Sequence, residues 1–472
     1  MIKNYLSPRL FFVFLTALFI AQMTPANAQV SEMTLDNGLR IIVAESHQVP
    51  IVAVDVWVKA GTRREKPGQE GVAHFLEHVL FKGTPTHPDE ESVDGAIEDL
   101  GGTLDAATSY DWAHFYTEVP SSGYPQAVAL LADILQHASI KSDAVDEERS
   151  IIIDEIGRES DDPIASLTDT VRGIFYDSSS AYGRPITGSV DDVRSVTRDE
   201  VAQFYSTYYV PNNVTVVVSG DVTPTEVDSL VDEQFHNWKR SISLPDEGSA
   251  FASHYASVPT DASRIHKYLT QRDANQSYVV MAFSAPSVSD TPDAWTMDVL
   301  LTLLGQGPNN RLDTSLRQKL HLVDSISADY LTQRDPGVFT IAVSLPTSNV
   351  DVVQADILDQ VRKVREAPVS DSELQRAKNA LKSSYLFDVD TDSGHADSLG
   401  FYDSIGTYQY DVQYLDHVSS VTAEALMQVA QKYLDPDAYT VALQVPTPDV
   451  STACNAQSNP RLTMTTAWSD QK

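Results

Sequence analysis

The chain carries the same succession of elements twice, at a constant offset along the sequence. In each copy a helical pattern ends at a Tyr-x-x-Pro sequence, because proline cannot continue a helix, and a β-branched strand follows. The strands span residues 214–219 and 439–444. The matched positions are Val196 and Val421, Thr197 and Thr422, Tyr208 and Tyr433, Pro211 and Pro436, and Thr215 and Thr440. This pattern predicts two homologous halves rather than one long domain.

Each half mixes alternating strands with amphipathic helices. We expect a hairpin over 33–43 that turns at Asn37-Gly38, and a strand over 52–59. The helical patterns cover residues 71–81, 92–100, 125–137 and 145–159. Hairpins combined with helices predict an α+β fold of two α/β sandwich halves with mixed antiparallel sheets, and not a doubly wound sheet.

Changes in composition predict where the halves begin and end. The segment 1–28 combines Lys3 and Arg9, an apolar run over 10–21 and a small-residue site at Ala26-Asn27-Ala28, as a secretory signal peptide does. We expect an N-terminal domain at 29–240, a linker at 241–265, a C-terminal domain at 266–450 and a tail at 451–472. The mature protein is therefore expected to be periplasmic, with no membrane segment.

The charge excludes some partners. Lys and Arg total 33 against 66 Asp and Glu, for a formal net charge of −33. Nucleic acids and anionic lipids need a basic surface, so neither is expected as a partner. The charge could steer basic substrates toward the protein, although solubility is the simpler explanation. The single cysteine, Cys454, excludes an intramolecular disulfide.

The segment His74-Phe75-Leu76-Glu77-His78 carries the chemistry. Its histidines are four residues apart, so a helix presents both imidazoles on one face, where they can bind one zinc ion. Glu77 can reach a water molecule at the same metal as general base. In the second copy, Val299, Thr302 and Leu303 occupy the positions of His74, Glu77 and His78. Zinc, one ion per chain, is therefore expected only in the first half.

A third protein ligand is expected from the acidic helix at 147–155. Glu148 and Glu155 are seven residues apart and share one helical face. Glu155 is the expected ligand, and Asp154, which points about 100° away, is the alternative. Glu148 would orient a ligand histidine or assist the base.

These motifs resemble the pitrilysin/insulinase family of metallopeptidases, in particular its mitochondrial-processing-peptidase-like branch. The resemblance covers roughly residues 33–446. It rests on Asn37-Gly38-Leu39-Arg40, on the run from Gly71 to Thr84 with its two histidines, on Glu148-Arg149 followed by Glu155, and on the segment at 183–188. The spacing between His78 and Glu155 also matches and supports Glu155 as ligand and Glu77 as base.

The resemblance implies a clam-shell chamber built with a homologous partner. It also implies peptide substrates that add as a strand to the segment at 101–109, so that Ala106, Ala107, Thr108 and Ser109 would bind substrate. Asp105 stands where relatives usually have Asn. Relatives place an Arg and a Tyr seven apart in the second half to bind substrate and stabilise the oxyanion. This chain has Arg317 but Asp324 in place of the phenol.

Three functions follow from these observations. The leading hypothesis is an exported zinc endopeptidase for small or unfolded peptides, acting as the catalytic subunit of a heterodimer whose partner supplies the Arg/Tyr pair. A homodimer that uses another donor is the alternative assembly. A non-catalytic structural subunit and a zinc-dependent peptide-binding protein are the alternative functions. The complete His74, Glu77 and His78 set argues against a purely structural subunit.

Overall fold

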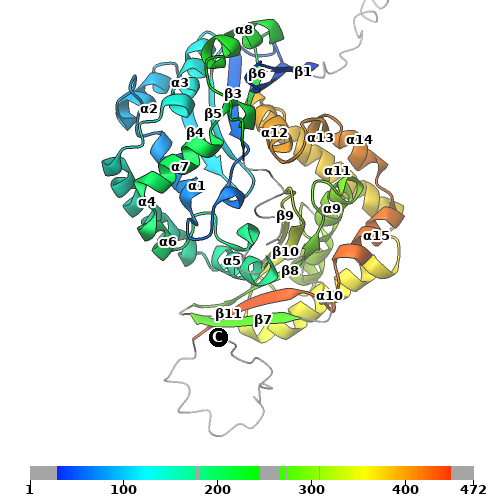
Figure 1. Cartoon of the computed structure of the whole chain (residues 1–472). Coiled ribbons are helices and arrows are strands. Elements are labelled where there is room, and N and C mark those ends of the chain that lie inside the picture. The colour runs from blue at the N-terminus through cyan, green and yellow to red at the C-terminus, as the bar shows by residue number, and fades with distance from the viewer. Residues whose placement is uncertain (1–28, 177–179, 245–264, 273, 308, 448–472) are drawn as a thin grey trace, which may run out of the picture.

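A computed structural model of the chain describes residues 29–176, 180–244, 265–272, 274–307 and 309–447. The chain forms two halves, each a sheet with helices packed against it, that lie opposite one another (Figure 1). The predicted signal peptide, the predicted tail and residues 245–264 of the predicted linker lie outside the described residues.

The first half contains a six-stranded sheet in the order β1-β2-β6-β3-β5-β4. β2 and β6 are parallel, and every other neighbouring pair is antiparallel. The strands are β1 (Gln29–Thr34), β2 (Arg40–Glu45), β3 (Ile51–Val58), β4 (Thr103–Thr108), β5 (Ala113–Pro120) and β6 (Val214–Gly220). The predicted hairpin and the predicted strand at 52–59 are both present, and β4 is an edge strand.

The second half repeats this order with one strand fewer, as β7-β11-β8-β10-β9. Its one parallel pair, β7 and β11, corresponds to β2 and β6. The strands are β7 (His266–Arg272), β8 (Ser277–Ala285), β9 (Ser325–Tyr330), β10 (Gly337–Leu345) and β11 (Thr440–Pro446). The predicted α+β fold of two related halves is confirmed.

Helices fill the connections between the strands. In the first half these are α1 (Val72–Leu80), α2 (Glu90–Glu98), α3 (Tyr124–His137), α4 (Ser142–Asp161), α5 (Pro163–Tyr176), α6 (Val190–Ser195), α7 (Arg198–Tyr208) and α8 (Pro224–Phe235). In the second half they are α9 (Thr291–Leu304), α10 (Val350–Glu366), α11 (Asp371–Asp388), α12 (Asp392–Ile405), α13 (Gln409–Val412), α14 (Tyr414–Ser420) and α15 (Ala423–Tyr433). The short helices are η1 (Thr62–Arg64), η2 (Ala181–Gly183), η3 (Pro211–Asn213), η5 (Thr347–Asn349) and a π-helix, η4 (Asp313–Lys319).

The duplicated sequence marks equivalent elements. α7 and α15 begin at Arg198 and Ala423, which are separated by the same offset as the matched positions. Both helices are followed by the strand that pairs parallel within its sheet. α9 corresponds to α1, and its Val299 and Leu303 are buried in the apolar core of the second half. The helix that carries the histidines is therefore a packing helix in the second copy.

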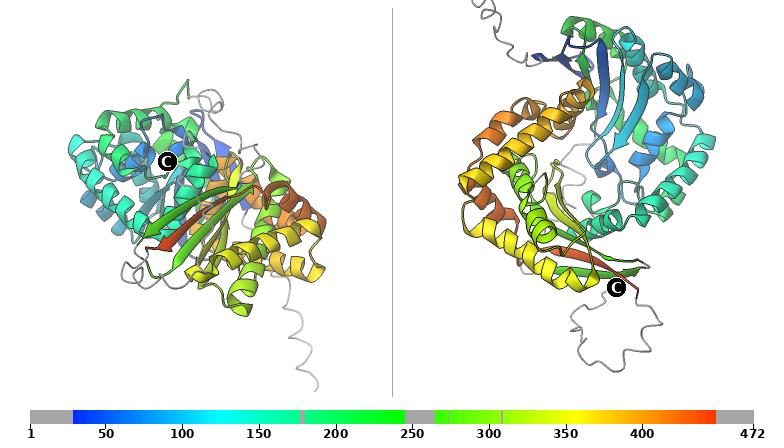
Figure 2. Two further views of the ribbon diagram at one scale, coloured as in Figure 1. Left: turned by 90° about the horizontal axis from the view of Figure 1, so that it is seen from below. Right: turned by 180° about the vertical axis from the view of Figure 1, so that it is seen from behind.

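The two halves exchange helices across their interface. α5, from the first half, packs against β8 and β11 of the second sheet, with Leu167 and Val171 in a shared apolar cluster. α12, from the second half, packs against β3 and β6 of the first sheet, with Leu399 and Trp57 in one apolar cluster. Figures 1 and 2 show the resulting arrangement of the halves. Each half thus completes the core of the other.

α12 is held on the first sheet by close packing and by buried charge. A Cβ at Gly400 would lie 2.0 Å from Trp57 Nε1, so a larger residue would push the helix off the sheet. One turn later the fully buried Asp403 contacts Arg40 and Lys59, both at 3.0 Å, and accepts a hydrogen bond from Thr215 at 2.7 Å. Removing one of these partners would destabilise the fold, because the charge of Asp403 would then be buried and unpaired.

In the part of the chain that the structure describes, the helices are either too short or too polar to cross a membrane.

Candidate metal centre and active site

The position at the N-terminus of α1 requires a glycine. Gly71, at its N-terminus, has φ 85°, and a Cβ there would lie 2.6 Å from the carbonyl oxygen of Thr187. The loop at 183–188 therefore packs directly against the start of the helix. The helix has no side-chain cap of its own at this residue. Instead Glu65 accepts a hydrogen bond from the backbone N–H of Ala73 at 3.0 Å, which satisfies a donor that the first turn leaves free.

Glu65 is buried, and this burial has an electrostatic cost. Burial raises the pKa of Glu65 to about 8, although backbone N–H groups of Ala73 and Gly71 oppose the shift. An acid with a raised pKa in the folded state binds more protons folded than unfolded. Its contribution to stability is therefore complete below its ordinary pKa near 4.5 and is lost as the pH rises through about 8.

We therefore expect Glu65→Gln to flatten the pH dependence of stability. The difference in free energy of unfolding between the variant and the wild type should shift by a few kcal/mol in favour of the variant as the pH rises from about 5 to 8. Urea unfolding at several pH values, at constant metal content, measures this difference. A pH-independent offset from the buried amide does not affect the result, whereas a difference that stays constant with pH would contradict it.

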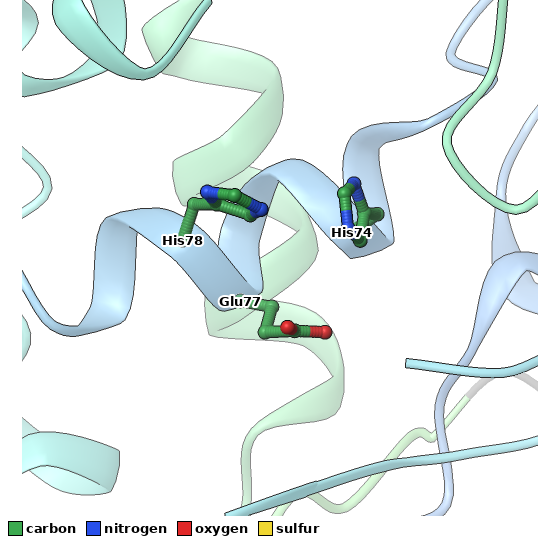
Figure 3. Close-up of side chains that lie close together, drawn as sticks. All are labelled: His74, Glu77 and His78. Atoms are coloured by element: carbon green, nitrogen blue, oxygen red, sulfur yellow. The ribbon is translucent and has the colours of Figure 1, made fainter. Parts of the chain in front are cut away.

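The two histidines and Glu77 project from α1 around one space. His74 is buried, whereas Glu77 and His78 are half-buried. One ligand atom from each lies within 4.8 Å of the other two, and the two imidazole ring centres are 4.8 Å apart. Figure 3 shows Glu77 between the two histidines along the helix. The spacing of the motif therefore produces the expected cluster.

Glu155 approaches both histidines from α4. Its carboxylate oxygens lie 3.7 Å from His74 Nε2 and 3.5 Å from His78 Nε2. These separations are long for hydrogen bonds. Two atoms that each lie roughly 2.1 Å from a tetrahedral zinc ion are about 3.4 Å apart, so the three side chains fit a shared zinc ion. Asp154, the alternative ligand, is exposed on α4.

Glu148 lies behind His78 rather than beside Glu77. The Nδ1 of His78 is 2.9 Å from Glu148 Oε2, and Lys82 Nζ is 2.7 Å from Glu148 Oε1. When Nδ1–H donates to Glu148, the lone pair of Nε2 is free to face the metal position. Of the two roles predicted for Glu148, these contacts favour orienting the histidine.

Burial and neighbouring charges shift the pKa values of the two histidines in opposite directions. Burial and the neighbouring His78 lower the pKa of His74 to about 4. Burial lowers the pKa of His78 as well, but the hydrogen bond with Glu148 and the nearby carboxylate of Glu155 outweigh burial and raise it to about 9. A metal ion needs neutral imidazoles, so its binding would displace the proton of His78 and weaken as the pH falls.

Glu77 is held by a hydroxyl from the neighbouring edge strand. Thr108 Oγ1 donates a hydrogen bond to Glu77 Oε2. Burial raises the pKa of Glu77, whereas the hydrogen bond from Thr108 and the nearby His78 oppose that shift. A carboxylate with a raised pKa is a stronger base, which suits the role expected for Glu77.

The predicted substrate strand is the exposed edge strand β4. Its Ala106, Ala107 and Thr108 pair on one side with β5. Ser109 lies beyond the end of the strand, where its N–H bonds to Trp112 and its carbonyl accepts from Thr62. Asp105 Oδ1 accepts from the N–H of Ala106 at 2.9 Å, so the unusual acid at this position occupies a backbone donor of the strand.

The described contacts of Arg317 lie within its own half. Its guanidinium forms an ion pair with Asp313 on the π-helix η4, and half of the side chain is exposed. Asp324 is exposed just before β9, and its N–H donates to the carbonyl of Ser344 at 2.8 Å. The structure records no contact between either residue and the histidines among the described residues.

Two residues at the site were not foreseen. Glu65, which directly follows the short helix η1, caps α1, and Lys82 extends the His78–Glu148 pair. Lys82 follows the motif by four residues, so helical spacing could have indicated it. No local pattern indicates Glu65, because its partner N–H groups become available only when the helix has formed.

Comparisons with known proteins identify the family to which the chain is similar. Residues 40–188 match the model of the insulinase family, peptidase family M16, and residues 195–381 match that of the peptidase M16 inactive domain. The chain is 30% identical over 417 residues to a zinc protease of Mycobacterium leprae, covering 87% of this chain and 90% of that one. It is 28% identical over 412 residues to a probable mitochondrial-processing peptidase subunit beta of Arabidopsis thaliana, covering 85% and 75%.

The fold has close structural neighbours as well. A protease from Helicobacter pylori superposes with a TM-score of 0.80 at 23% identity, over 89% of this chain and all of that one. The first family model covers the segment with the two histidines, and the second runs from the last part of the first half into the second half. Sequence, topology and comparisons agree that the chain belongs to the insulinase family of peptidases, family M16.

Proposed function

We propose that this protein is an exported zinc endopeptidase that hydrolyses small or unfolded peptides. The observation that carries the proposal is the convergence of His74, His78 and Glu155 at separations that suit one zinc ion, with Glu77 beside them. A structural subunit needs no such set, and a peptide-binding protein needs no base next to the metal position.

The residues divide the chemistry among them. His74, His78 and Glu155 would hold the ion, which when bound acidifies water and polarises the scissile carbonyl. Glu77 accepts a proton from the attacking water and passes it to the leaving amine. Thr108 holds the Glu77 carboxylate in place, and Glu148 fixes the tautomer and orientation of His78.

The edge strand β4 supports a peptide substrate. An extended peptide can pair with the free edge of β4, which brings its backbone alongside Thr108 and therefore beside Glu77. Backbone pairing needs an unfolded segment and reads few side chains, so Ala106 and Ala107 would bind many sequences. A folded protein cannot present its backbone to such an edge.

Two features of the sequence bear on the location and the assembly of the proposed enzyme. The signal-like segment 1–28 supports export and a periplasmic location. The Arg317 and Asp324 pair supports a heterodimer in which a homologous partner supplies a complete Arg/Tyr pair, with a homodimer as the alternative. The relative in Arabidopsis is named as one subunit of a peptidase, which is consistent with paired chains.

Metal content tests the proposed ligands. We expect one zinc ion per chain at the α1 site, and loss of that ion in His74→Ala and Glu155→Ala, because each change removes one of three protein ligands. Asp154→Ala is the matched control, since it removes a neighbouring exposed acid from the same helix and should leave zinc unchanged. The zinc content of each variant is measured by mass spectrometry after gel filtration. Retention of the ion in Glu155→Ala together with its loss in Asp154→Ala would assign the ligand to Asp154.

A further inference from the structure

A second group of metal-binding side chains lies on the other face of the first sheet. Asp55 is on β3, His114 is on the neighbouring strand β5, and Asp397 is on α12. Asp55 lies on the same face of β3 as Ala53 and Trp57, which pack against α12. Val54 and Val56 lie on the opposite face, in the core that contains α1. The group is therefore separated from the histidines of α1 by the thickness of the sheet.

The three side chains converge closely enough to share one ion. His114 Nδ1 lies 3.1 Å from Asp55 Oδ1 and 3.9 Å from Asp397 Oδ1. One ligand atom from each residue lies within 4.8 Å of the other two. The first distance is that of a hydrogen bond between His114 and Asp55, and the two distances bracket the value of about 3.4 Å for two ligands of a tetrahedral zinc ion.

Burial makes an ion at this position favourable. The side chain of Asp55 is 3% exposed and that of His114 is 7% exposed, whereas Asp397 is 59% exposed at the entrance. Two carboxylates beside a neutral imidazole leave two negative charges, one of them buried, and a buried charge is costly unless it is neutralised. A charged imidazole would balance one carboxylate, and a divalent cation would balance both.

The surroundings fix the imidazole and leave space for further ligands. The ring of His114 lies between Trp57, at 4.2 Å between ring centres, and Tyr116, at 4.8 Å. A cavity of about 350 Å³ opens beside Asp55, His114 and Asp397. Such a volume holds the water molecules that would complete the coordination of a metal with three protein ligands.

We propose that Asp55, His114 and Asp397 form a second divalent-cation site, of the class that accepts Zn²⁺ or Mn²⁺. One imidazole and two carboxylates are a ligand set that suits both ions. Asp55 and His114 belong to the first half and Asp397 to the second, so the ion connects the two halves. The packing of Gly400 on Trp57 and the buried Asp403 hold α12 in the position that this requires.

Metal binding in a chain without the α1 site tests this proposal separately from the proposed function. In the full-length chain with His74→Ala and His78→Ala, equilibrium dialysis against Zn²⁺ and against Mn²⁺ is expected to show one bound ion per chain. Adding Asp55→Asn or Asp397→Asn should remove that ion, because each keeps the shape of the side chain and removes a ligand charge. The wild type should bind one Zn²⁺ more than the double variant.

The control separates this site from general binding to an acidic surface. Asp390→Asn removes one exposed charge from the segment just before α12, and it should leave the bound ion in place. Since Asp397 is largely exposed, Asp397→Asn should fold, and circular dichroism verifies this. A folded double variant that binds no cation would overturn the proposal and would show that Asp55 and His114 form an ion pair only. Equal losses in Asp397→Asn and Asp390→Asn would overturn it too.

Discussion

Glu77→Gln is expected to lower peptide hydrolysis by about 10²–10⁴-fold, the usual contribution of a general base, while one zinc ion remains bound at the α1 site. Glutamine keeps the length of the side chain and can still accept the hydrogen bond from Thr108. It cannot accept a proton from water at neutral pH. The three expected ligands, His74, His78 and Glu155, are untouched, so the defect should appear in the rate and not in metal content.

The measurement is hydrolysis of a quenched fluorescent peptide by wild type and variant at equal zinc content. Glu147→Gln is the matched control, because it removes one exposed acid from α4 without touching the site, and its rate should stay within about twofold of wild type, since surface substitutions are usually small in effect. Activity of Glu77→Gln within a few-fold of wild type would show that another group is the base.

Much of this site can be predicted because its geometry is local. The separation of His74 and His78 is fixed by one turn of helix, and Glu148 and Glu155 share a face for the same reason. Periodicity therefore predicted α1 and α4 within a few residues. What spacing alone left open was the choice between Glu155 and Asp154, and the packing of α4 against α1 favours Glu155.

The exchange of α5 and α12 between the halves could not be predicted in the same way. An apolar face shows that a helix packs against something, but it does not say which sheet. Leu399 and Trp57 meet only in the folded chain, as do Asp55 and Asp397. The same limit explains why Glu65 was missed, since its hydrogen-bond partners lie at the start of another helix.

The isolated chain is expected to hydrolyse peptides about 10²–10³-fold more slowly than a complex with a homologous partner, because removing one oxyanion donor typically costs that much. The first half supplies the expected metal ligands and the expected base. In the second half Arg317 pairs with Asp313, and the exposed Asp324 stands where the family resemblance implies a tyrosine. An ionised carboxylate cannot donate a hydrogen bond to a developing oxyanion and would repel it. A partner with an Arg/Tyr pair would supply the missing donor.

The test compares the purified chain with the same chain after addition of the candidate partner, with the mass of each species measured by light scattering.

Asp324→Tyr in the isolated chain gives a second test, and it should raise activity if the missing phenol is the only defect. Asp351→Tyr is its matched control, because it places a phenol at another exposed position of the second half and should change nothing. Full activity of a homodimer, unchanged by the partner and by Asp324→Tyr, would mean that another residue of this chain serves as the donor. A rise in activity on addition of the partner, with a single α1-type zinc site per complex, would instead place the donor on the partner, since the expected metal ligands and base all belong to this chain.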